Sequence, residues 1–374
     1  MPIEKTIGID LRMWEHPGIG RYIRELTGAM LRFENPERFR FLAYERDHKD
    51  ILLHLGSARL DRAFSPIYSL SEQAELFGFS NRVDLLHVPH FNAPLFCRSK
   101  LIVTVHDLIY LKSDLQSLAG NGQSRSMQSL QRFYVRTLLG GVCRNATDVI
   151  VVSDFTRRDL ELFYPGCAGR TRVIREAASG TFRAHGDAEA AKKQFGLGPE
   201  YLLFVGSLKA HKNLAVLLDA FATLRRDHEQ AQLVVVGKRD RKEQAIFDRV
   251  STEPGVKYLG VRADDELAQL YRGAKALVLP SLWEGFGLTA LEAMACGTPV
   301  ISSDRASLPE VVGDAALLFN PEDTQRLAEL MQLILTDREM HNSLSRKGLQ
   351  RSKEFSWENT AHETLKLYEK ALSS

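Results

Sequence analysis

Two carboxylates in one short segment are the residues of this sequence best placed to do chemistry. Glu284 and Glu292 are eight positions apart, and Gly285-Phe286-Gly287 follows the first of them. An ionised carboxylate accepts two hydroxyl hydrogen bonds at once, which suits a vicinal diol. A pair of Glu residues at this spacing is usually two solvated helix charges, but the small apolar residues 293–296 after Glu292 disfavour that interpretation. We therefore expect both carboxylates to bind hydroxyl groups.

The same segment predicts an anion site between the two carboxylates. The apolar run 276–280 reads as a strand, and a helix is expected to begin near Gly287. The first backbone N–H groups of a helix have no partner within the helix and bind anions readily. With a diphosphate bound there, Glu284 would face the sugar attached to one end of it and Glu292 would face the ribose attached to the other.

A second loop supplies cations. The apolar strand Tyr201–Val205 leads into Gly206-Ser207-Leu208-Lys209-Ala210-His211-Lys212. A leaving diphosphate gains negative charge as its bond to a sugar breaks, so a fixed cation stabilises that transition state. Lys212 is the first candidate for this role and Lys209 the second. The alternative is that these lysines are simply solvated at the mouth of a loop.

Two further positions follow strands of the N-terminal half. Gly18 and Gly20 come soon after the first strand, where glycines let the backbone approach a phosphate or sugar, although a tight turn explains them equally well. No third glycine completes a dinucleotide fingerprint, which disfavours NAD. His106 and Asp107 stand at the carboxyl end of another strand, the edge where open α/β sheets bind ligands, so we expect them to contact a donor sugar or an acceptor; a structural His is the alternative.

The elements that position these residues form two βα series of similar size. Short apolar runs alternate with helical stretches, which predicts α/β architecture with two Rossmann-like doubly wound domains. We expect an N-terminal domain over residues 1–180, a second over 181–355, and a final helix over 356–374 that crosses back to the first. The predicted strands are Thr6–Asp10, Phe39–Tyr44, Leu85–Val88, Leu101–His106, Val149–Ser153, Tyr201–Val205, Gln232–Val236, Val256–Leu259, Ala276–Pro280 and Pro299–Ser302.

Composition excludes several classes. The net charge is +2, and residues 1–175 hold 24 Lys and Arg against 19 Asp and Glu. Two basic clusters, 125–144 and Arg157-Arg158, suit anionic lipid or a phosphate-bearing acceptor, or are simply solvated; they are too sparse for nucleic acid. The four cysteines lack metal or redox spacing, so we expect them to be reduced. No leader or membrane span is evident, which predicts a cytoplasmic protein that at most lies on the inner face of a membrane.

These stretches together resemble the GT-B glycosyltransferases of family 4, over nearly the whole chain. The motifs that carry the resemblance are the segments around Gly18, His106, Lys212 and Glu284, together with 152–160, 259–261, 264–267, 302–316 and 355–358. In that family the Glu-x7-Glu pattern corresponds to Glu284 and Glu292. The resemblance implies donor contacts from the first Glu, Lys212 and the amides of Gly285, Phe286, Gly287 and Leu288, ribose contacts from Glu292, and contact of His106 with the transferred sugar.

One departure from the family pattern affects the phosphate site. Many relatives carry Arg where this chain has Ser207, so Lys209 either replaces that cation or leaves the task to Lys212 and the helix start. The family is retaining, and no Asp-x-Asp motif occurs in the chain, so we expect a metal-independent reaction with no cofactor.

The resemblance also implies substrates. The motifs resemble those of bacterial mannosyltransferases of polysaccharide assembly. This resemblance favours GDP-mannose as the donor and a glycan on a polyprenyl diphosphate as the acceptor. A UDP-sugar donor, a non-catalytic sugar-nucleotide binding protein and a two-domain epimerase remain the alternatives.

Overall fold

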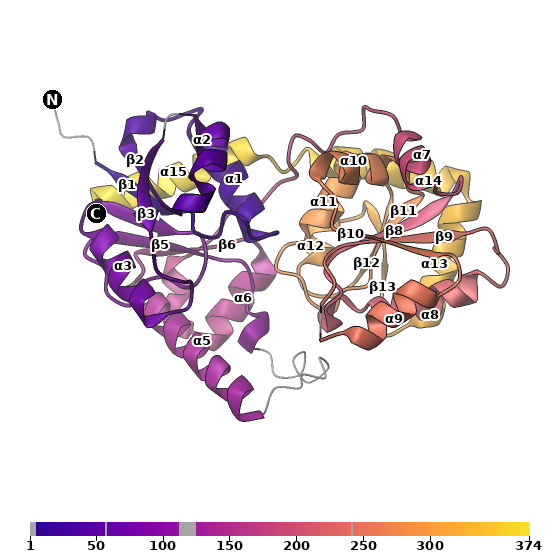
Figure 1. Cartoon of the computed structure of the whole chain (residues 1–374), viewed down its shortest axis with the longest axis horizontal. Helices are drawn as coiled ribbons and strands as arrows, with labels where there is room; N and C mark the ends of the chain where they lie inside the picture. The colour runs from indigo at the N-terminus through magenta and orange to yellow at the C-terminus, as the bar shows by residue number, and fades with distance from the viewer. Residues whose placement is uncertain (1–4, 57, 112–124, 241) are drawn as a thin grey trace. The chain divides into compact units, whose positions relative to one another are not determined.

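The computed structural model describes residues 5–56, 58–111, 125–240 and 242–374, and the chain divides into two compact units (Figure 1). The first contains the described residues up to Leu111, then Arg125–Glu176 and Ser356–Ser374. The second contains Ala177–Phe355. The side chains of residues 125–132 and 134 lie outside the described ones, and so does much of the basic cluster 125–144.

The first unit is built on a seven-stranded sheet whose neighbouring strands are all parallel. In sheet order its strands are β3 (Arg59–Ala63), β2 (Phe39–Tyr44), β1 (Ile7–Asp10), β4 (Leu85–Val88), β5 (Lys100–Val105), β6 (Asp148–Val151) and β7 (Thr171–Val173). Its helices are α1 (Ile19–Met30), α2 (His48–Leu55), α3 (Leu70–Ser80), α5 (Arg125–Asn145), α6 (Asp154–Phe163) and α15 (Trp357–Ser373), with short 3-10 turns η1 (Pro36–Arg38), η2 (Glu45–Asp47), η3 (Ile109–Leu111) and η4 (Pro165–Arg170).

The second unit is built on a six-stranded parallel sheet. In sheet order its strands are β10 (Val256–Gly260), β9 (Gln232–Val236), β8 (Tyr201–Val205), β11 (Ala276–Leu279), β12 (Val300–Ser303) and β13 (Ala316–Phe319). Its helices are α7 (Ala190–Phe195), α8 (Leu214–Leu224), α9 (Gln244–Thr252), α10 (Asp264–Gly273), α11 (Leu288–Ala295), α12 (Leu308–Val312), α13 (Thr324–Thr336) and α14 (Arg338–Ser352), with one 3-10 turn, η5 (Ala210–Lys212).

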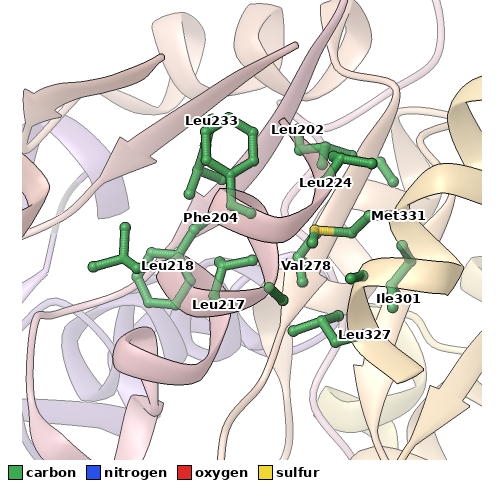
Figure 2. Packing of buried hydrophobic residues seen from close by; sticks show 14 of the residues in the cluster. Leu202, Phe204, Leu217, Leu218, Leu224, Leu233, Val278, Ile301, Leu327 and Met331 are labelled. Carbon is green, nitrogen blue, oxygen red and sulfur yellow. The ribbon is translucent and has the colours of Figure 1, made fainter. Parts of the chain in front are cut away.

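The core of the second unit shows why its strands and helices pair as they do. The apolar residues of α8 recur at Leu214, Leu217, Leu218 and Phe221, which puts them on one helix face. That face packs with α13 against the side chains that alternate strand residues, such as Leu202, direct to one side of the sheet (Figure 2). Each fully buried side chain of this size contributes roughly 1.5–3 kcal/mol to folding. This core fixes the ends of β8 and β11.

Helix α15 belongs to the first unit. Ser356 caps it by accepting a hydrogen bond from the N–H of Asn359, and the helix packs on α1 (Figure 1). Near its far end, the Tyr368 hydroxyl lies 2.5 Å from Nδ1 of His87, a wholly buried residue of β4. The last helix therefore contributes to the centre of the N-terminal core.

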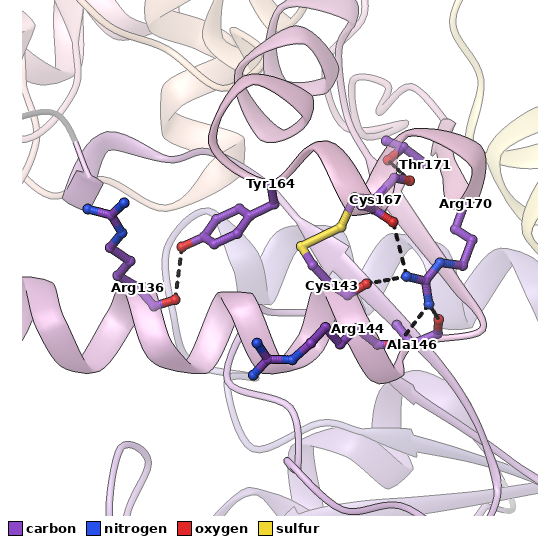
Figure 3. Close-up of a disulfide and its surroundings, with 9 residues drawn as sticks. Arg136, Cys143, Arg144, Ala146, Tyr164, Cys167, Arg170 and Thr171 are labelled. Carbon is purple, nitrogen blue, oxygen red and sulfur yellow. Dashed lines mark hydrogen bonds between the residues drawn. A yellow bond between two sulfur atoms is a disulfide. The ribbon is translucent and has the colours of Figure 1, made fainter.

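The expectation that all four cysteines are reduced is wrong in this structure. Cys143 and Cys167 form a disulfide between the end of α5 and η4, with their Cα atoms 5.3 Å apart (Figure 3). Arg170 donates hydrogen bonds to the carbonyls of Cys143 and Ala146, which holds η4 against the helix. The two cysteines are 24 residues apart, so no short spacing motif reveals the pair. Cys97 and Cys296 are free.

Within the described residues, no helix has both the length and the apolar character required to cross a membrane.

Candidate functional site

Two loops of the second unit meet at the carboxyl edge of its sheet. Strands β8 and β11 are neighbours, so the segments that follow them run side by side. The N–H of Leu282 donates to the carbonyl of His211 at 2.8 Å, which ties the two loops together. Lys212 Nζ then reaches Glu284 Oε1 at 2.6 Å. The structure therefore brings together the cation and the first carboxylate that the sequence singled out.

The Lys212–Glu284 pair is partly buried and charged. Their side chains are 18% and 13% exposed. Burial acts to raise the pKa of Glu284, but the charge and hydrogen bond of Lys212, and a hydrogen bond from Ser281 at 2.7 Å, outweigh it and lower that pKa. Burial and the positive charge of Lys212 lower the pKa of His211 to about 4. At neutral pH Glu284 is therefore ionised and His211 is a neutral imidazole.

The start of α11 lies directly after Glu284 in the chain. Gly287 occupies the N-cap with φ +111°, a conformation that side chains disfavour, and a Cβ there would come within 2.9 Å of Leu308. Ser307 Oγ lies 2.9 Å from the Glu284 carbonyl and 2.8 Å from that of Phe286, which fixes the loop. No side chain among the described residues caps this helix. The Ala290 N–H donates to the Gly287 carbonyl, so the N–H groups of Leu288 and Thr289 are the ones available to an anion.

Glu292 is placed differently from an exposed helix carboxylate. It lies within α11, is wholly buried, and accepts a hydrogen bond from the Tyr271 hydroxyl at 3.0 Å. Burial excludes the interpretation as a solvated helix charge. Contact with a ribose stays a prediction. Tyr271 comes from α10, and its role could not be read from the spacing of the two Glu residues.

The remaining residues of the cation loop differ in exposure. Ser207 is partly buried, whereas Lys209 is exposed and precedes η5. Gly206, which precedes Ser207, packs closely on Gly237, the residue after β9, because a Cβ on Gly237 would come within 1.8 Å of the Gly206 carbonyl oxygen. The idea that Lys209 replaces the missing Arg at position 207 stays a prediction.

In the first unit, His106 is held through both ring nitrogens. Nδ1 lies 3.0 Å from Glu176 Oε1 and Nε2 lies 3.0 Å from the Pro89 carbonyl oxygen. Burial acts to lower the pKa of His106, but Glu176 and the carbonyl outweigh it and raise that pKa. Because both partners are acceptors, the arrangement favours the doubly protonated ring. The Tyr22 ring packs edge-on at 4.8 Å.

Glu176 is the functional candidate that the sequence alone did not reveal. It is 70 residues from His106, and its exposed fraction is only 4%. Asp107, beside the His, accepts a hydrogen bond from the N–H of Ile109 at 3.0 Å and so starts the turn η3. Contact of Asp107 with an acceptor stays a prediction.

The two glycines of the N-terminal motif have different surroundings. Gly20 lies in α1, where a Cβ would come within 2.1 Å of the Trp14 carbonyl oxygen, so packing alone requires a glycine. Gly18 is the N-cap of α1, and a Cβ there would have no atom within 4 Å. Donor contact at these two positions stays a prediction.

Within the described part of the chain, no group of three or more His, Cys, Asp or Glu side chains could hold a metal ion.

The fold and the paired loops define a class: two Rossmann-like units, with a cation, a carboxylate and a helix start gathered at one sheet edge of the second. Comparison with known proteins agrees. The family model described as Glycosyltransferase Family 4 matches residues 18–177, and the model described as Glycosyl transferases group 1 matches 186–351. The chain belongs to glycosyltransferase family 4, a family of transferase enzymes with the GT-B fold.

Individual relatives are similar over parts of their length. The chain is 33% identical over 227 residues to O-antigen chain mannosyltransferase B of Escherichia coli. The aligned region covers 59% of this chain and 60% of that protein. The chain is 28% identical over 294 residues to the serotype-specific mannosyltransferase WbdA of Escherichia coli, covering 77% of this chain and 35% of that one. The chain thus spans less than two thirds of the length of each of these relatives.

A solved structure supports the fold. The crystal structure of HepE from Anabaena in complex with UDP and glucose matches with a TM-score of 0.79 and 19% identity, covering 98% of this chain and 99% of that one.

Proposed function

We propose that this chain transfers a hexose from a nucleotide sugar to a hydroxyl group of a glycan acceptor in polysaccharide synthesis, with retention of anomeric configuration. The observation that carries the proposal is the ion pair between Lys212 and Glu284 beside the uncapped start of α11. These three features are one cation, one hydroxyl acceptor and one row of amides, which are the groups that a sugar diphosphate requires.

The ion pair gives the site a way to respond to its donor. In this structure Lys212 and Glu284 neutralise each other at 2.6 Å. An arriving diphosphate competes for the ammonium, while the amides of α11 bind its other oxygens. Glu284 is then released to accept hydrogen bonds from sugar hydroxyls. Lys212 stabilises the leaving diphosphate more than the bound donor, because negative charge grows there as the glycosidic bond breaks.

Retention follows from a front-face substitution. In that reaction the acceptor hydroxyl attacks from the side that the diphosphate leaves, and the departing phosphate oxygen takes the hydroxyl proton. A site rich in phosphate-binding groups suits this course, because it holds leaving group and acceptor close together. The anomeric configuration of the product, determined by NMR coupling constants, tests it, and an inverted product contradicts it.

Metal independence rests on the same groups. Lys212 and the helix start supply the positive charge that a divalent ion would otherwise provide. We expect turnover to be unchanged by EDTA. A steep loss that Mg²⁺ or Mn²⁺ restores would refute this part of the proposal.

The proposed donor is GDP-mannose, and the support comes from relatives whose names describe mannosyltransferases. The experiment is a thermal-shift panel of GDP-, UDP- and ADP-sugars followed by product analysis. GDP-mannose should raise the melting temperature most, since ligand binding to the folded state stabilises it. A larger shift with a UDP-sugar would reassign the donor, and no shift with any of them would remove the proposed function.

The proposed acceptor is a glycan on a polyprenyl diphosphate at the inner face of a membrane. The support is the excess of Lys and Arg in residues 1–175, which suits an anionic surface. Arg157, from one basic cluster, is already paired with Asp154 at 2.8 Å, so the attraction to lipid should be weak. Flotation with vesicles containing phosphatidylglycerol should show binding at low salt that is lost at high salt.

A further inference from the structure

Aromatic rings gather at the carboxyl edge of the first sheet. Tyr68, which follows β3, and Tyr110, in η3, are 45% and 47% exposed. Phe91, which follows β4, packs against both, with its ring centroid 6.1 Å from that of Tyr68 and 6.3 Å from that of Tyr110. His90 packs on Phe91 at 4.1 Å. Two partly exposed rings are thus supported by a buried pair.

A buried chain of polar groups fixes the position of Tyr68. Its hydroxyl lies 3.4 Å from Nε2 of His90, whose Nδ1 lies 2.5 Å from the Asn92 side-chain oxygen. Asn92 donates to Glu72 at 2.5 Å, and Glu72 pairs with Arg12 at 2.9 Å. Burial lowers the pKa of His90 to about 3, more than the Asn92 bond raises it, so the neutral ring accepts from the Tyr68 hydroxyl through Nε2.

The backbone at Tyr68 is held in an unfavourable conformation. Its φ is +66°, in the left-handed region that side chains other than glycine disfavour. The Tyr68 N–H donates to Glu72 Oε2 at 2.7 Å, so the same buried carboxylate holds backbone and ring. Such strain persists only where the surroundings impose it, and it concentrates at binding sites. A loop that needed only to turn would be more stable with glycine here.

The aromatic cluster is continuous with His106 and Asp107, the two candidate ligand contacts of the same unit. Pro89, whose carbonyl binds His106, directly precedes His90 and Phe91. Tyr110 is close enough to Asp107 for that carboxylate to contribute, after burial, to raising the Tyr110 pKa. Apolar ring faces beside carboxylates and hydroxyls suit a pyranose, which has one apolar face of C–H groups and a rim of hydroxyls.

From this geometry we infer that Tyr68 and Tyr110 form a stacking site for a hexopyranose of the glycan acceptor, with Phe91 as the buried ring that supports both. The inference rests on the proposed function, because it names where and how that function's acceptor binds. It assigns carbohydrate, not lipid, as the part of the acceptor recognised here.

The test is ligand-observed NMR on the full chain with three probes, α-mannotriose, maltotriose and chitotriose. Saturation transferred from the protein to the sugar C–H protons should be seen with at least one of them. The Tyr68→Ala/Tyr110→Ala double variant should weaken that binding by about tenfold, the effect expected for loss of an aromatic contact. Tyr68→Phe keeps the ring and should retain most of it. Phe96→Ala, which removes a ring 78% exposed elsewhere in the same unit, is the matched control and should bind as the wild type does.

Two results would overturn the inference: no trisaccharide bound by the wild type, or binding unchanged in a double variant whose melting temperature shows that it is folded. If the double variant does not fold, Tyr110→Ala alone decides in the same way, because η3 places that ring by a separate turn. Donor hydrolysis in the absence of acceptor is measured in parallel. A wild type that binds a trisaccharide but neither binds nor hydrolyses any nucleotide sugar would refute the proposed function and leave the sugar site standing.

Discussion

At the scale of single residues, the central feature is the ion pair between Lys212 and Glu284. Removing either leaves the other partly buried without its main counter-charge. Lys212→Ala should lower turnover by about 10²-fold, as for the loss of one transition-state contact. Turnover at saturating donor checks this, and Lys209→Ala, at an exposed lysine of the same loop, is the matched control with a smaller expected loss.

Glu284→Gln, alone and combined with Lys212→Ala, shows whether the pair acts as a unit. The fold-loss of turnover in the double variant should be much smaller than the product of the two single fold-losses, because each single variant already breaks the ion pair. Independent, multiplying losses would contradict a shared role.

The Glu176–His106 pair predicts a pH-dependent stability. The pKa of His106 is raised in the folded state, so its contribution is fully present below the unfolded value of about 6.5 and is lost as pH rises through the folded value. Urea unfolding of wild type and Glu176→Gln should therefore differ most at acidic pH and converge at alkaline pH. A difference that grows with pH would show that the His is not charged in the folded protein.

Residue spacing revealed some of these partners and not others. Lys212 and Glu284 could be proposed because each stands in a short strand-loop-helix segment of characteristic residue types. Glu176 could not, because it is 70 residues from His106 and only the pairing of strands brings the two together. Tyr271 beside Glu292 and the Cys143–Cys167 disulfide were missed for the same reason.

At the scale of elements, all ten predicted strands are present, and the three that were missed stand at sheet edges. They are β3, β7 and β13. An edge strand is covered on fewer sides and needs no continuous apolar run, as in the sequence Arg-Leu-Asp-Arg-Ala of β3. This reason does not apply to β13, whose sequence Ala-Leu-Leu-Phe is apolar throughout. Central parallel strands are buried on both faces and are therefore apolar throughout, which makes them easy to recognise.

The start of α11 should tolerate no side chain at position 287. Gly287→Ala forces a φ of +111° on a residue with a Cβ that meets Leu308. We expect a loss of about 1–3 kcal/mol in the free energy of unfolding, together with weaker donor binding as the amides shift. Denaturant unfolding and titration with GDP-mannose measure the two effects.

Gly78→Ala in α3 is the matched control, because a Cβ there has no atom within 4 Å and lies in a helix. It should be neutral or slightly stabilising. Equal stability of the Gly287→Ala variant and the wild type would contradict the role given to the left-handed cap.

Helix α15 should matter to the stability of the first unit. Tyr368→Phe removes the hydroxyl that bonds to the buried His87 and leaves that nitrogen without its partner, which costs about 1–3 kcal/mol. Ser373→Ala, on the exposed end of the same helix, should cost little. Urea unfolding of the two variants tests this. If the Tyr368→Phe variant had the free energy of unfolding of the wild type, the Tyr368–His87 contact would contribute nothing to stability.

At the scale of the whole molecule, each unit carries part of the proposed machinery on the same kind of sheet edge. The first presents His106, Asp107 and the aromatic cluster after β3, β4 and β5, and the second presents Lys212 and Glu284 after β8 and β11. The architecture could be predicted because alternating apolar and helical runs specify parallel sheets. Substrate identity could not, because the motifs that bind a diphosphate are indifferent to the base and largely to the sugar.

The most direct measurement is a crystal structure of the full chain with its preferred nucleotide sugar bound. It should show the diphosphate within hydrogen-bond distance of Lys212 Nζ and the first amides of α11, with Glu284 turned from the lysine to the sugar hydroxyls. A nucleotide sugar bound at another edge of the sheet would contradict the proposed function. So would a diphosphate that does not contact Lys212 Nζ while the Lys212–Glu284 ion pair remains intact.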